Sequence, residues 1–358
     1  MRILHIDLDF GTGGAEKFIV HLSKEQVKFH DVTILSLWDI NLKTDIFVNQ
    51  IDPKVKFITL KKRKGFDLKM LVHLVSFLKK NKYDVVHTHR STINYLLLIN
   101  FLFLKKINIV HTIHNDAFKE TPSKILRKIK FYFIKFGYFK PVTISDESQQ
   151  SFLNAYNIDA PIIYNGTPKL SLSKEFSNVK EEMKVYKGKG DLILSVGRIS
   201  KQKNYQSLVN VVEDLNLEGF NLSLVIIGRK ELNLNVKLNE KVHLLGVKNN
   251  PFDYMNCSDF FCLSSLYEGL PITLIESVQS NALNIVTPVG GMTDIIKDLK
   301  NGFVCANTTE KEIKNTIKKA LLTSKKDRLN YVLEAKKIFN KKFNIQKVHL
   351  QYEKIYNN

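Results

Sequence analysis

Short apolar segments alternate along the chain with longer segments of helical spacing. In the first half the apolar segments are residues 3–6, 32–37, 56–60, 84–88, 107–112 and 141–144, and in the second half they are 191–196, 222–227, 242–245, 259–263, 284–286 and 302–305. The segments between them, such as 15–26 and 68–80, carry apolar residues at helical spacing. This alternation predicts parallel sheets that helices cover on both faces.

The alternation of apolar segments and helical segments is interrupted once, at residues 165–190, where polar residues prevail and Gly and Pro lie near the ends. We place the boundary of two domains here. We expect an N-terminal domain at 1–170, a second domain at 171–340, and a C-terminal helix at 341–358 that packs back on the first domain. The predicted fold class is α/β, with two doubly wound Rossmann-like domains in tandem and a cleft between them. Ligands of such sheets bind outside the carboxyl ends of the strands.

The composition is that of a globular protein with an anionic partner. Apolar residues make up 44% of the chain and charged residues 25%, which excludes disorder, collagen and a disulfide scaffold. The three cysteines are expected to be reduced thiols. The longest apolar stretch, 95–104, is too short to span a bilayer, which needs about 20 residues. The net charge of +19 suggests a nucleic acid, a phosphorylated small molecule or an anionic membrane surface.

A glycine-rich turn follows the first predicted strand. It reads Gly11 to Glu16 and precedes a helix, whose N-terminus attracts anions. It departs from the dinucleotide fingerprint because a glutamate replaces the third glycine. A turn that holds a phosphate or a sugar and a plain turn are both consistent with it. Asp7 and Asp9 fit the metal-binding DxD pattern, but this spacing is common, and we interpret them as strand-end residues.

Histidines follow the next predicted strands in pairs. His87 and His89 form the first pair, and His111 and His114 form the second. A metal site needs three or four convergent ligands, so we expect no metal. His114 begins a loop and is the candidate for hydrogen bonding or acid–base chemistry in the cleft. A structural role is the alternative for the other three.

Charged side chains follow the strands of the second half. Arg198 and Lys203 lie in one loop, and two cations of different geometry suit a diphosphate, although a solvated basic turn is the alternative. Glu268 and Glu276 are separated by seven residues. Between them, the turn Gly269-Leu270-Pro271 is predicted to open a helix, and its free backbone N–H groups attract anions. Carboxylates accept hydroxyl hydrogens, so the whole set suits a sugar nucleotide.

These motifs resemble the retaining glycosyltransferases of family 4, which have the GT-B fold. The likeness extends from residue 1 to about 305. The matching motifs are Gly13-Gly14-Ala15-Glu16, Ile163-Tyr164-Asn165-Gly166, Val196-Gly197-Arg198 with Lys203-Asn204, Val242-His243-Leu244-Leu245-Gly246, Glu268 to Glu276, and Thr287-Pro288-Val289-Gly290-Gly291. Two positions depart from the family: Gly228-Arg229-Lys230 stands where Gly-x-Gly is frequent, and Asn115 replaces a common acidic residue.

The resemblance implies roles for individual residues. Arg198 and Lys203 would hold the donor diphosphate, Glu276 would bind the ribose hydroxyls, and Gly14 would cradle the phosphate. The transferred sugar would be held by Glu268 with the backbone amides of Gly269 and Leu270, and His114 would lie beside it. His114 and Glu268 are thus the expected catalytic residues.

The implied enzyme is a retaining hexosyl- or N-acetylhexosaminyltransferase of cell-surface polysaccharide synthesis, such as capsule or lipopolysaccharide. The C-terminal domain would bind a UDP- or GDP-sugar, and the N-terminal domain would bind a lipid-linked glycan acceptor. No cofactor or metal is expected, because in this fold the leaving phosphate accepts the proton of the acceptor. The alternatives are a sugar-nucleotide epimerase or a phosphorylase of the same fold and, with less support, a basic nucleic-acid-binding protein; we expect no nucleic acid as partner.

A basic helix is predicted within residues 121–140. Its basic sector contains Lys124, Arg127, Lys128 and Lys135, with Phe131 and Tyr138 beside them, and another sector contains Ile125, Ile129, Phe133 and Phe136. The basic and aromatic sector fits an anionic membrane surface. We therefore expect a cytoplasmic protein that is peripheral on the inner face of the plasma membrane. A solvated helix face over the core is the alternative.

Overall fold

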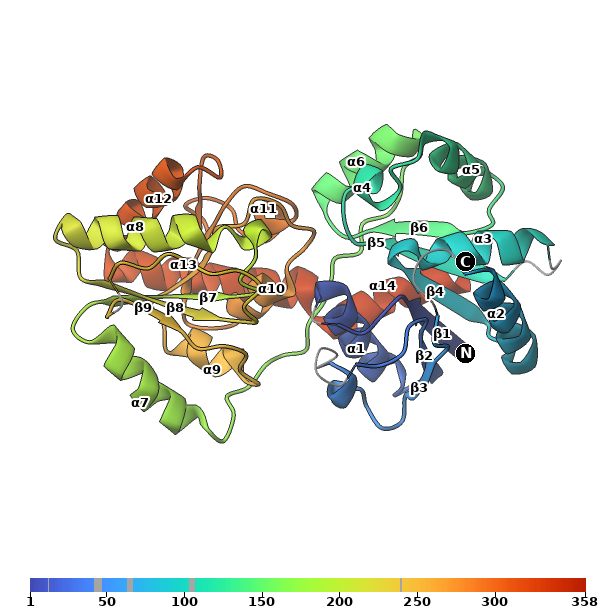
Figure 1. The fold of residues 1–358 in the computed structure, drawn as a ribbon, viewed down its shortest axis with the longest axis horizontal. Helices are drawn as coiled ribbons and strands as arrows, with labels where there is room; N and C mark the ends of the chain where they lie inside the picture. Colours follow the sequence, from blue (N-terminus) through green and yellow to red (C-terminus); the bar gives the residue numbers. More distant parts are fainter. Residues whose placement is uncertain (12, 42–46, 63–66, 103–106, 239) are drawn as a thin grey trace. The chain divides into compact units, whose positions relative to one another are not determined.

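The structure is a computed structural model that describes residues 1–11, 13–41, 47–62, 67–102, 107–238 and 240–358. Each half of the chain forms a six-stranded parallel sheet with helices around it (Figure 1). This confirms the predicted fold class of two Rossmann-like domains. The twelve strands are the predicted ones, and their ends differ from the prediction by at most one residue, because strands buried on both faces read as continuous apolar runs.

The first sheet has the order β3-β2-β1-β4-β5-β6. Its strands are β1 (Arg2–Asp7), β2 (Asp31–Ser36), β3 (Lys56–Thr59), β4 (Val85–His89), β5 (Asn108–Ile113) and β6 (Lys140–Thr143). Its helices are α1 (Gly14–Gln26), α2 (Leu68–Asn81), α3 (Ile93–Leu102), α4 (Ala117–Glu120), α5 (Lys124–Lys135), α6 (Asp146–Tyr156) and the C-terminal α14 (Ile345–Asn357). This is the strand order of the doubly wound dinucleotide-binding fold.

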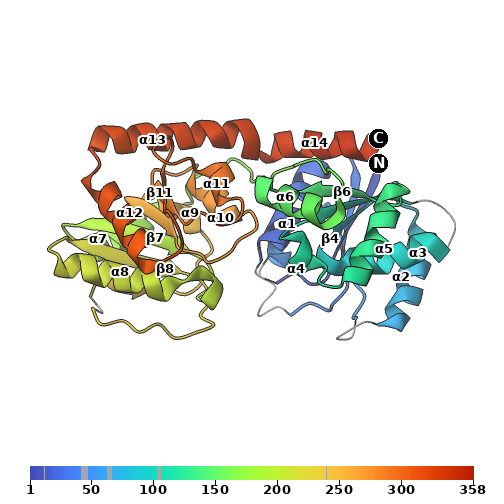
Figure 2. The ribbon, with the colours of Figure 1, turned by 90° about the horizontal axis from the view of Figure 1, so that it is seen from above.

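The two faces of the first sheet differ in chemistry. Leu4 and Val86 point to the face that packs on α2 and α3. Side chains of the opposite parity, such as His5 and His87, point to the face that α1 and α14 cover (Figure 2). Because side chains alternate along a strand, β1 places Leu4 and Ile6 on the first face and His5 and Asp7 on the other, and β4 places His87 and His89 on the same face as His5.

The second sheet has the order β12-β11-β10-β7-β8-β9. Its strands are β7 (Asp191–Val196), β8 (Leu222–Ile227), β9 (Val242–Leu244), β10 (Phe260–Leu263), β11 (Leu283–Val286) and β12 (Phe303–Val304). Its helices are α7 (Phe176–Lys187), α8 (Tyr205–Leu217), α9 (Pro251–Asn256), α10 (Ile272–Ser277), α11 (Met292–Ile295), α12 (Glu310–Leu322) and α13 (Lys325–Ile338). The helices α8 and α12 cover one face, and α7 and α9 cover the other (Figure 1).

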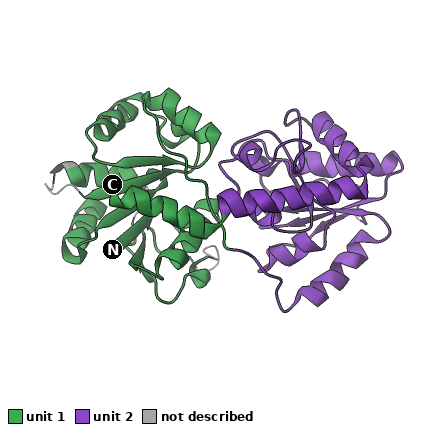
Figure 3. Cartoon of the chain, turned by 180° about the vertical axis from the view of Figure 1, so that it is seen from behind, with its two compact units in different colours: residues 1–168, 344–358 green, residues 169–343 purple. Residues whose placement is uncertain are grey.

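By its internal contacts the chain divides into two compact units (Figure 3). Unit 1 comprises residues 1–168 and 344–358, and unit 2 comprises residues 169–343. The predicted boundaries lay at residues 170 and 340. Helix α14 therefore belongs to unit 1, where Tyr352 Oη lies 2.9 Å from Thr112 Oγ1 of β5.

The boundary between the units, after residue 168, lies within the polar region 165–190 in which we placed it. The same region contains a helix that we did not predict: residues 176–187 form α7, which packs on α9, β7 and β8. Only Val179 and Met183 of this helix are buried. These two positions, four residues apart, give an apolar stripe too narrow to stand out in a polar sequence.

Candidate functional site

In unit 2, the loops at the carboxyl ends of β7 and β10 bring Lys203 and Glu268 together. Lys203 Nζ lies 2.6 Å from Glu268 Oε1, and the exposed fractions of the two side chains are only 12% and 8%. Ser265 Oγ donates a hydrogen bond of 2.7 Å to the same carboxylate oxygen. Shielding from water strengthens the attraction between these charges. The pair therefore holds two predicted site residues in defined positions.

Glycines let the loops around this pair approach one another. A Cβ atom at Gly197 would lie 2.9 Å from Lys203 Cε. The lysine side chain therefore occupies the space that a side chain at position 197 would need. Gly290 has φ +58°, and a Cβ atom there would lie 2.4 Å from the backbone oxygen of Glu268. Gly291 N donates to Gly269 O at 2.6 Å. The glycine turns of the sequence thus fix the loop that carries Glu268.

Arg198 belongs to a second charged group on the same edge of the sheet. Its Nη1 lies 3.5 Å from Glu231 Oε1, and Arg229 Nη2 lies 2.7 Å from the same oxygen. The hydrogen bond from Arg229, helped by Arg198, lowers the pKa of the Glu231 carboxyl. Arg229 is the middle residue of Gly228-Arg229-Lys230, the segment in which Lys230 replaces the second glycine of the family pattern, and it becomes part of an Arg–Glu–Arg group. Sequence reasoning missed Glu231, whose partners are visible only in the folded chain.

The turn Gly269-Leu270-Pro271 leads into the helix that carries Glu276, as the sequence predicted. Helix α10 has six residues and begins at Ile272, directly after Pro271. The field of a helix falls off within its first turn, and Gly269 lies outside the helix. Glu276 and Leu270 are both buried, each 4% exposed. Positive charge at this edge therefore comes mainly from the arginine and lysine side chains.

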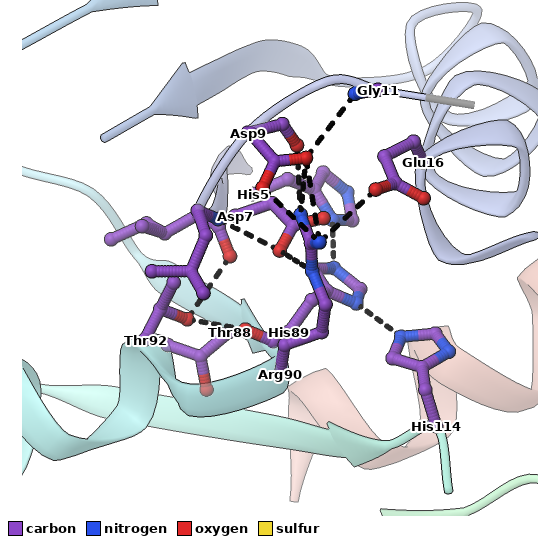
Figure 4. A network of polar contacts seen from close by, with 12 residues as sticks. His5, Asp7, Asp9, Gly11, Glu16, Thr88, His89, Arg90, Thr92 and His114 are labelled. Carbon is purple, nitrogen blue, oxygen red and sulfur yellow. Dashed lines mark hydrogen bonds and ion pairs between the residues drawn. The ribbon is translucent and has the colours of Figure 1, made fainter. Parts of the chain in front are cut away.

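In unit 1, Arg90 gathers three carboxylates (Figure 4). Its Nε lies 2.6 Å from Asp7 Oδ1, its Nη1 lies 3.1 Å from Glu16 Oε1, and its Nη2 lies 3.4 Å from Asp9 Oδ1. Asp7 and Asp9, the candidate DxD pair, are both tied to this guanidinium. Sequence reasoning missed Arg90, although a cation directly after the His87-Thr-His89 strand end was a signal that could have indicated it.

Gly14 opens α1, and Glu16 lies in the first turn of this helix. A Cβ atom at Gly13 would lie 2.3 Å from Glu16 Oε2, so the glutamate side chain folds back over the turn. Burial raises the pKa of Glu16 to about 7, although the charge of Arg90 acts in the opposite direction. A phosphate at Gly14 would therefore face a carboxyl group, and the phosphate contact of Gly14 stays a prediction.

His114 lies close to Arg90 in this group (Figure 4). It is 6% exposed, and its Nε2 lies 3.0 Å from His89 Nδ1. Burial lowers the pKa of His114 to about 3, so the ring is neutral near pH 7. His87, His89 and His111 are buried and hydrogen-bonded, for example between His111 Nε2 and Glu120 Oε1 at 2.7 Å.

The nitrogens of His5, His87 and His89 lie within 4.8 Å of one another, a spacing that a metal ion could bridge. Both ring nitrogens of each residue, however, lie within hydrogen-bond distance of a protein atom. A metal would have to break these buried hydrogen bonds, which are costly to lose. The chemistry of the three rings therefore favours a hydrogen-bond network, and metal independence remains a prediction.

Both units match known families of proteins. Residues 12–168 match the profile described as Glycosyltransferase Family 4, and residues 178–338 match the profile described as Glycosyl transferases group 1. The chain therefore belongs to the family 4 glycosyltransferases with the GT-B fold, as the motifs indicated, and it is a hexosyltransferase of polysaccharide biosynthesis.

Named relatives and solved structures agree with this assignment. The chain is 28% identical over 258 residues to the UDP-Gal:alpha-D-GlcNAc-diphosphoundecaprenol alpha-1,3-galactosyltransferase of Escherichia coli, which covers 66% of each chain. It is 24% identical over 347 residues to the capsular polysaccharide biosynthesis glycosyltransferase CapH of Staphylococcus aureus, 92% of this chain and 93% of that one. The fold matches Anabaena HepE in complex with UDP-glucose with a TM-score of 0.81, 16% identity and coverage of 99% and 98%.

The raised pKa of Glu16 predicts a pH dependence of stability. A carboxyl group whose pKa rises on folding, from 4.5 to about 7, binds its proton more tightly in the folded state, so the group lowers stability as pH increases through this interval. We expect the free energy of unfolding of Glu16→Gln, relative to wild type, to increase from about pH 4.5 to about pH 7. Urea unfolding at several pH values measures this difference.

The matched control is Glu147→Gln, on the exposed part of α6. Its stability difference from wild type should stay flat over the same interval. A flat or falling difference for Glu16→Gln would show that the burial of Glu16 does not govern its proton affinity.

Proposed function

We propose that the protein transfers a hexose or N-acetylhexosamine, with retention, from a UDP- or GDP-sugar to a lipid-linked glycan acceptor. The observation that carries the proposal is the largely shielded Lys203–Glu268 pair at the carboxyl ends of the strands of unit 2, with Arg198 in the same loop as Lys203. The names of relatives support it: the Escherichia coli protein is named for a UDP-Gal donor and a diphosphoundecaprenol-linked acceptor, and HepE was solved with UDP-glucose.

The charges of unit 2 suit the departure of a diphosphate. When the bond from the anomeric carbon to the phosphate oxygen breaks, negative charge develops on that oxygen. Lys203 as a point charge and Arg198 as a planar fork stabilise this charge more than they stabilise the ground state. The acceptor oxygen bonds to the anomeric carbon on the face that the phosphate leaves, and its proton passes to the departing phosphate. Glu268 accepts hydrogen bonds from hydroxyls of the sugar.

Helix α5 is the proposed membrane contact, but with a different face from the one predicted. Its exposed apolar side chains lie at positions i, i+4, i+7 and i+11 and form one stripe, Ile125 at 75%, Ile129 at 43%, Tyr132 at 44% and Phe136 at 63% exposed. Lys124, Lys128 and Lys135 are exposed on the same helix. An apolar stripe with lysines beside it suits an interfacial helix on an anionic leaflet.

Two residues of the predicted membrane surface have other roles. Phe131 packs against the core cluster that contains Ile113 and Phe152. Arg127 Nη1 donates to the backbone oxygens of Thr121 and Pro122 at 2.7 and 2.8 Å. The rotation of α5 about its own axis places Phe131 against this core cluster. The same rotation leaves the stripe Ile125, Ile129, Tyr132 and Phe136 exposed.

No helix in the described ranges is long and apolar enough to cross a membrane. We propose that α5 attaches the protein peripherally to the cytoplasmic face of the plasma membrane, whose anionic lipids attract lysines. A lipid-linked acceptor is presented at such a surface. This attachment would bring unit 1 to the acceptor.

The donor site is tested by substitutions in unit 2. We expect Arg198→Ala, Lys203→Ala and Glu276→Ala each to lower turnover at least about 100-fold, because each removes a charged contact to the donor. Lys201→Ala, an exposed lysine of the same turn, should stay within about twofold of wild type. The assay is release of nucleoside diphosphate across a panel of nucleotide sugars. Near-normal rates in the three folded variants would mean that the donor binds elsewhere.

We also propose that transfer needs no metal ion, since Arg90 holds both carboxylates of the DxD pair. Activity should survive EDTA within about twofold. Complete loss in EDTA that manganese or magnesium restores would contradict this proposal and favour Asp7 and Asp9 as metal ligands.

If α5 contacts the membrane, both its lysines and its exposed apolar side chains contribute to the binding of vesicles. Lys124→Glu/Lys128→Glu/Lys135→Glu should lower binding to anionic vesicles at least about tenfold, because each lysine contributes about 1 kcal/mol, weakened by salt. Ile125→Ser/Phe136→Ser should also lower binding, and its loss should depend less on salt. Co-sedimentation with vesicles at low and physiological salt measures both effects.

The matched control makes the same charge change on unit 2. Lys311, Lys325 and Lys326 are exposed, and their joint replacement by glutamate should leave most vesicle binding intact. All variants should keep donor hydrolysis. Equal loss in this control would attribute the binding to net charge alone, and unchanged binding in the α5 variants would refute the membrane contact.

A further inference from the structure

A chain of hydrogen bonds connects the end of α1 to His114. Gln26 Oε1 lies 2.7 Å from His5 Nε2, His5 Nδ1 lies 3.1 Å from His89 Nε2, and His89 Nδ1 lies 3.0 Å from His114 Nε2. Figure 4 shows the three histidines of this chain. Gln26, His5 and His89 have no exposed surface. Water therefore does not compete for these bonds.

The three rings are neutral near pH 7. Burial lowers the pKa of His5 to about 4, that of His114 to about 3 and that of His89 well below its ordinary value. A neutral imidazole carries one N–H group and one lone pair. Each bond between two rings therefore joins one donor to one acceptor, and all rings must be oriented with the same polarity. The group at one end of the chain decides the tautomers of all three.

Gln26 is that end group. Its amide oxygen accepts from His5 Nε2–H, so His5 Nδ1 accepts from His89 Nε2–H, and His89 Nδ1 accepts from His114 Nε2–H. The lone pair of His114 then lies on Nδ1. This polarity follows from the orientation of a single side-chain amide.

A second branch is compatible with this orientation of the Gln26 amide. Gln26 Nε2 donates to Tyr356 Oη at 3.1 Å, and Tyr356 Oη lies 2.7 Å from His87 Nδ1. His87 Nε2 in turn lies 2.7 Å from Thr112 Oγ1. With Gln26 as the donor, Tyr356 donates to His87 Nδ1, and His87 donates to Thr112. Every group of the branch is then satisfied, and Tyr356 of α14 is the partner of the Gln26 amide nitrogen.

We propose that Gln26 is a positioning residue that sets the tautomer of His114 and leaves its Nδ1 as a hydrogen-bond acceptor. A lone pair accepts from a hydroxyl and repels a phosphate oxygen, which has only lone pairs. The substrate group that faces His114 is therefore a hydroxyl of the sugar; this last step rests on the proposed function. The alternative polarity, with the Gln26 amide reversed, would place N–H on His114 Nδ1 and make it a donor.

The tautomers are measured on the full-length wild-type protein, without any substrate. Selective ¹⁵N labelling of histidine and long-range ¹H–¹⁵N correlation spectra separate protonated from unprotonated ring nitrogens, and a His114→Asn spectrum assigns His114. We expect His114 to be protonated on Nε2 and unprotonated on Nδ1. A protonated Nδ1 would overturn the inference.

The role of Gln26 is tested by Gln26→Leu, which removes the acceptor but keeps most of the volume. We expect the Nδ1–H form of His114 to become populated, kcat of donor hydrolysis to fall up to about tenfold, the loss expected for one hydrogen bond, and KM to change by less than about twofold. The matched control is Thr88→Val, which removes a buried hydroxyl 2.9 Å from His111 Nδ1, outside this chain. It should keep the wild-type tautomer of His114.

A wild-type tautomer of His114 in Gln26→Leu would overturn the positioning role, whatever the activity of the variant. The proposed function fails separately. Near-normal donor hydrolysis by His114→Ala would remove His114 from the sugar site, while the tautomer measured in the wild type would still test the assignment to Gln26.

Discussion

Polar side chains that are buried at the carboxyl ends of parallel strands need partners inside the protein, and this constraint shapes both units. In unit 1 it connects Gln26 to His114 through two further histidines. In unit 2 it joins Lys203 to Glu268. A buried polar group without a partner costs about 1–3 kcal/mol, so these networks hold their members in one arrangement. The side chains are therefore oriented before a substrate binds, which is the condition for electrostatic catalysis.

The two units differ in the charged groups at their strand ends. In unit 1, Arg90 faces the three carboxylates Asp7, Asp9 and Glu16. In unit 2, the cations Arg198, Lys203 and Arg229 lie in the loops that also hold the carboxylates Glu231 and Glu268. The guanidinium and ammonium groups of unit 2 suit a diphosphate, and the neutral His114 of unit 1 suits hydroxyl groups. This difference is consistent with the proposal that the donor binds to unit 2 and the acceptor to unit 1.

The sequence predicted the strands closely because buried parallel strands are continuous apolar runs, and it predicted Lys203 and Glu268 because they follow such strands. It did not reveal Arg90, Glu231 or Gln26, whose roles depend on partners far away in the sequence. It also misjudged α5, because the spacing of lysines defines a face but not the side on which Phe131 meets the core. Helix α7 escaped notice because only two of its residues are buried.

The central claim is that unit 2 binds the donor through its diphosphate, and a crystal structure with bound UDP tests it most directly. We predict that the diphosphate oxygens lie within hydrogen-bond distance of Lys203 Nζ and the Arg198 guanidinium, with the ribose hydroxyls at Glu276. A nucleotide bound at the Gly14 turn of unit 1, with Lys203 still paired only to Glu268, would contradict the account.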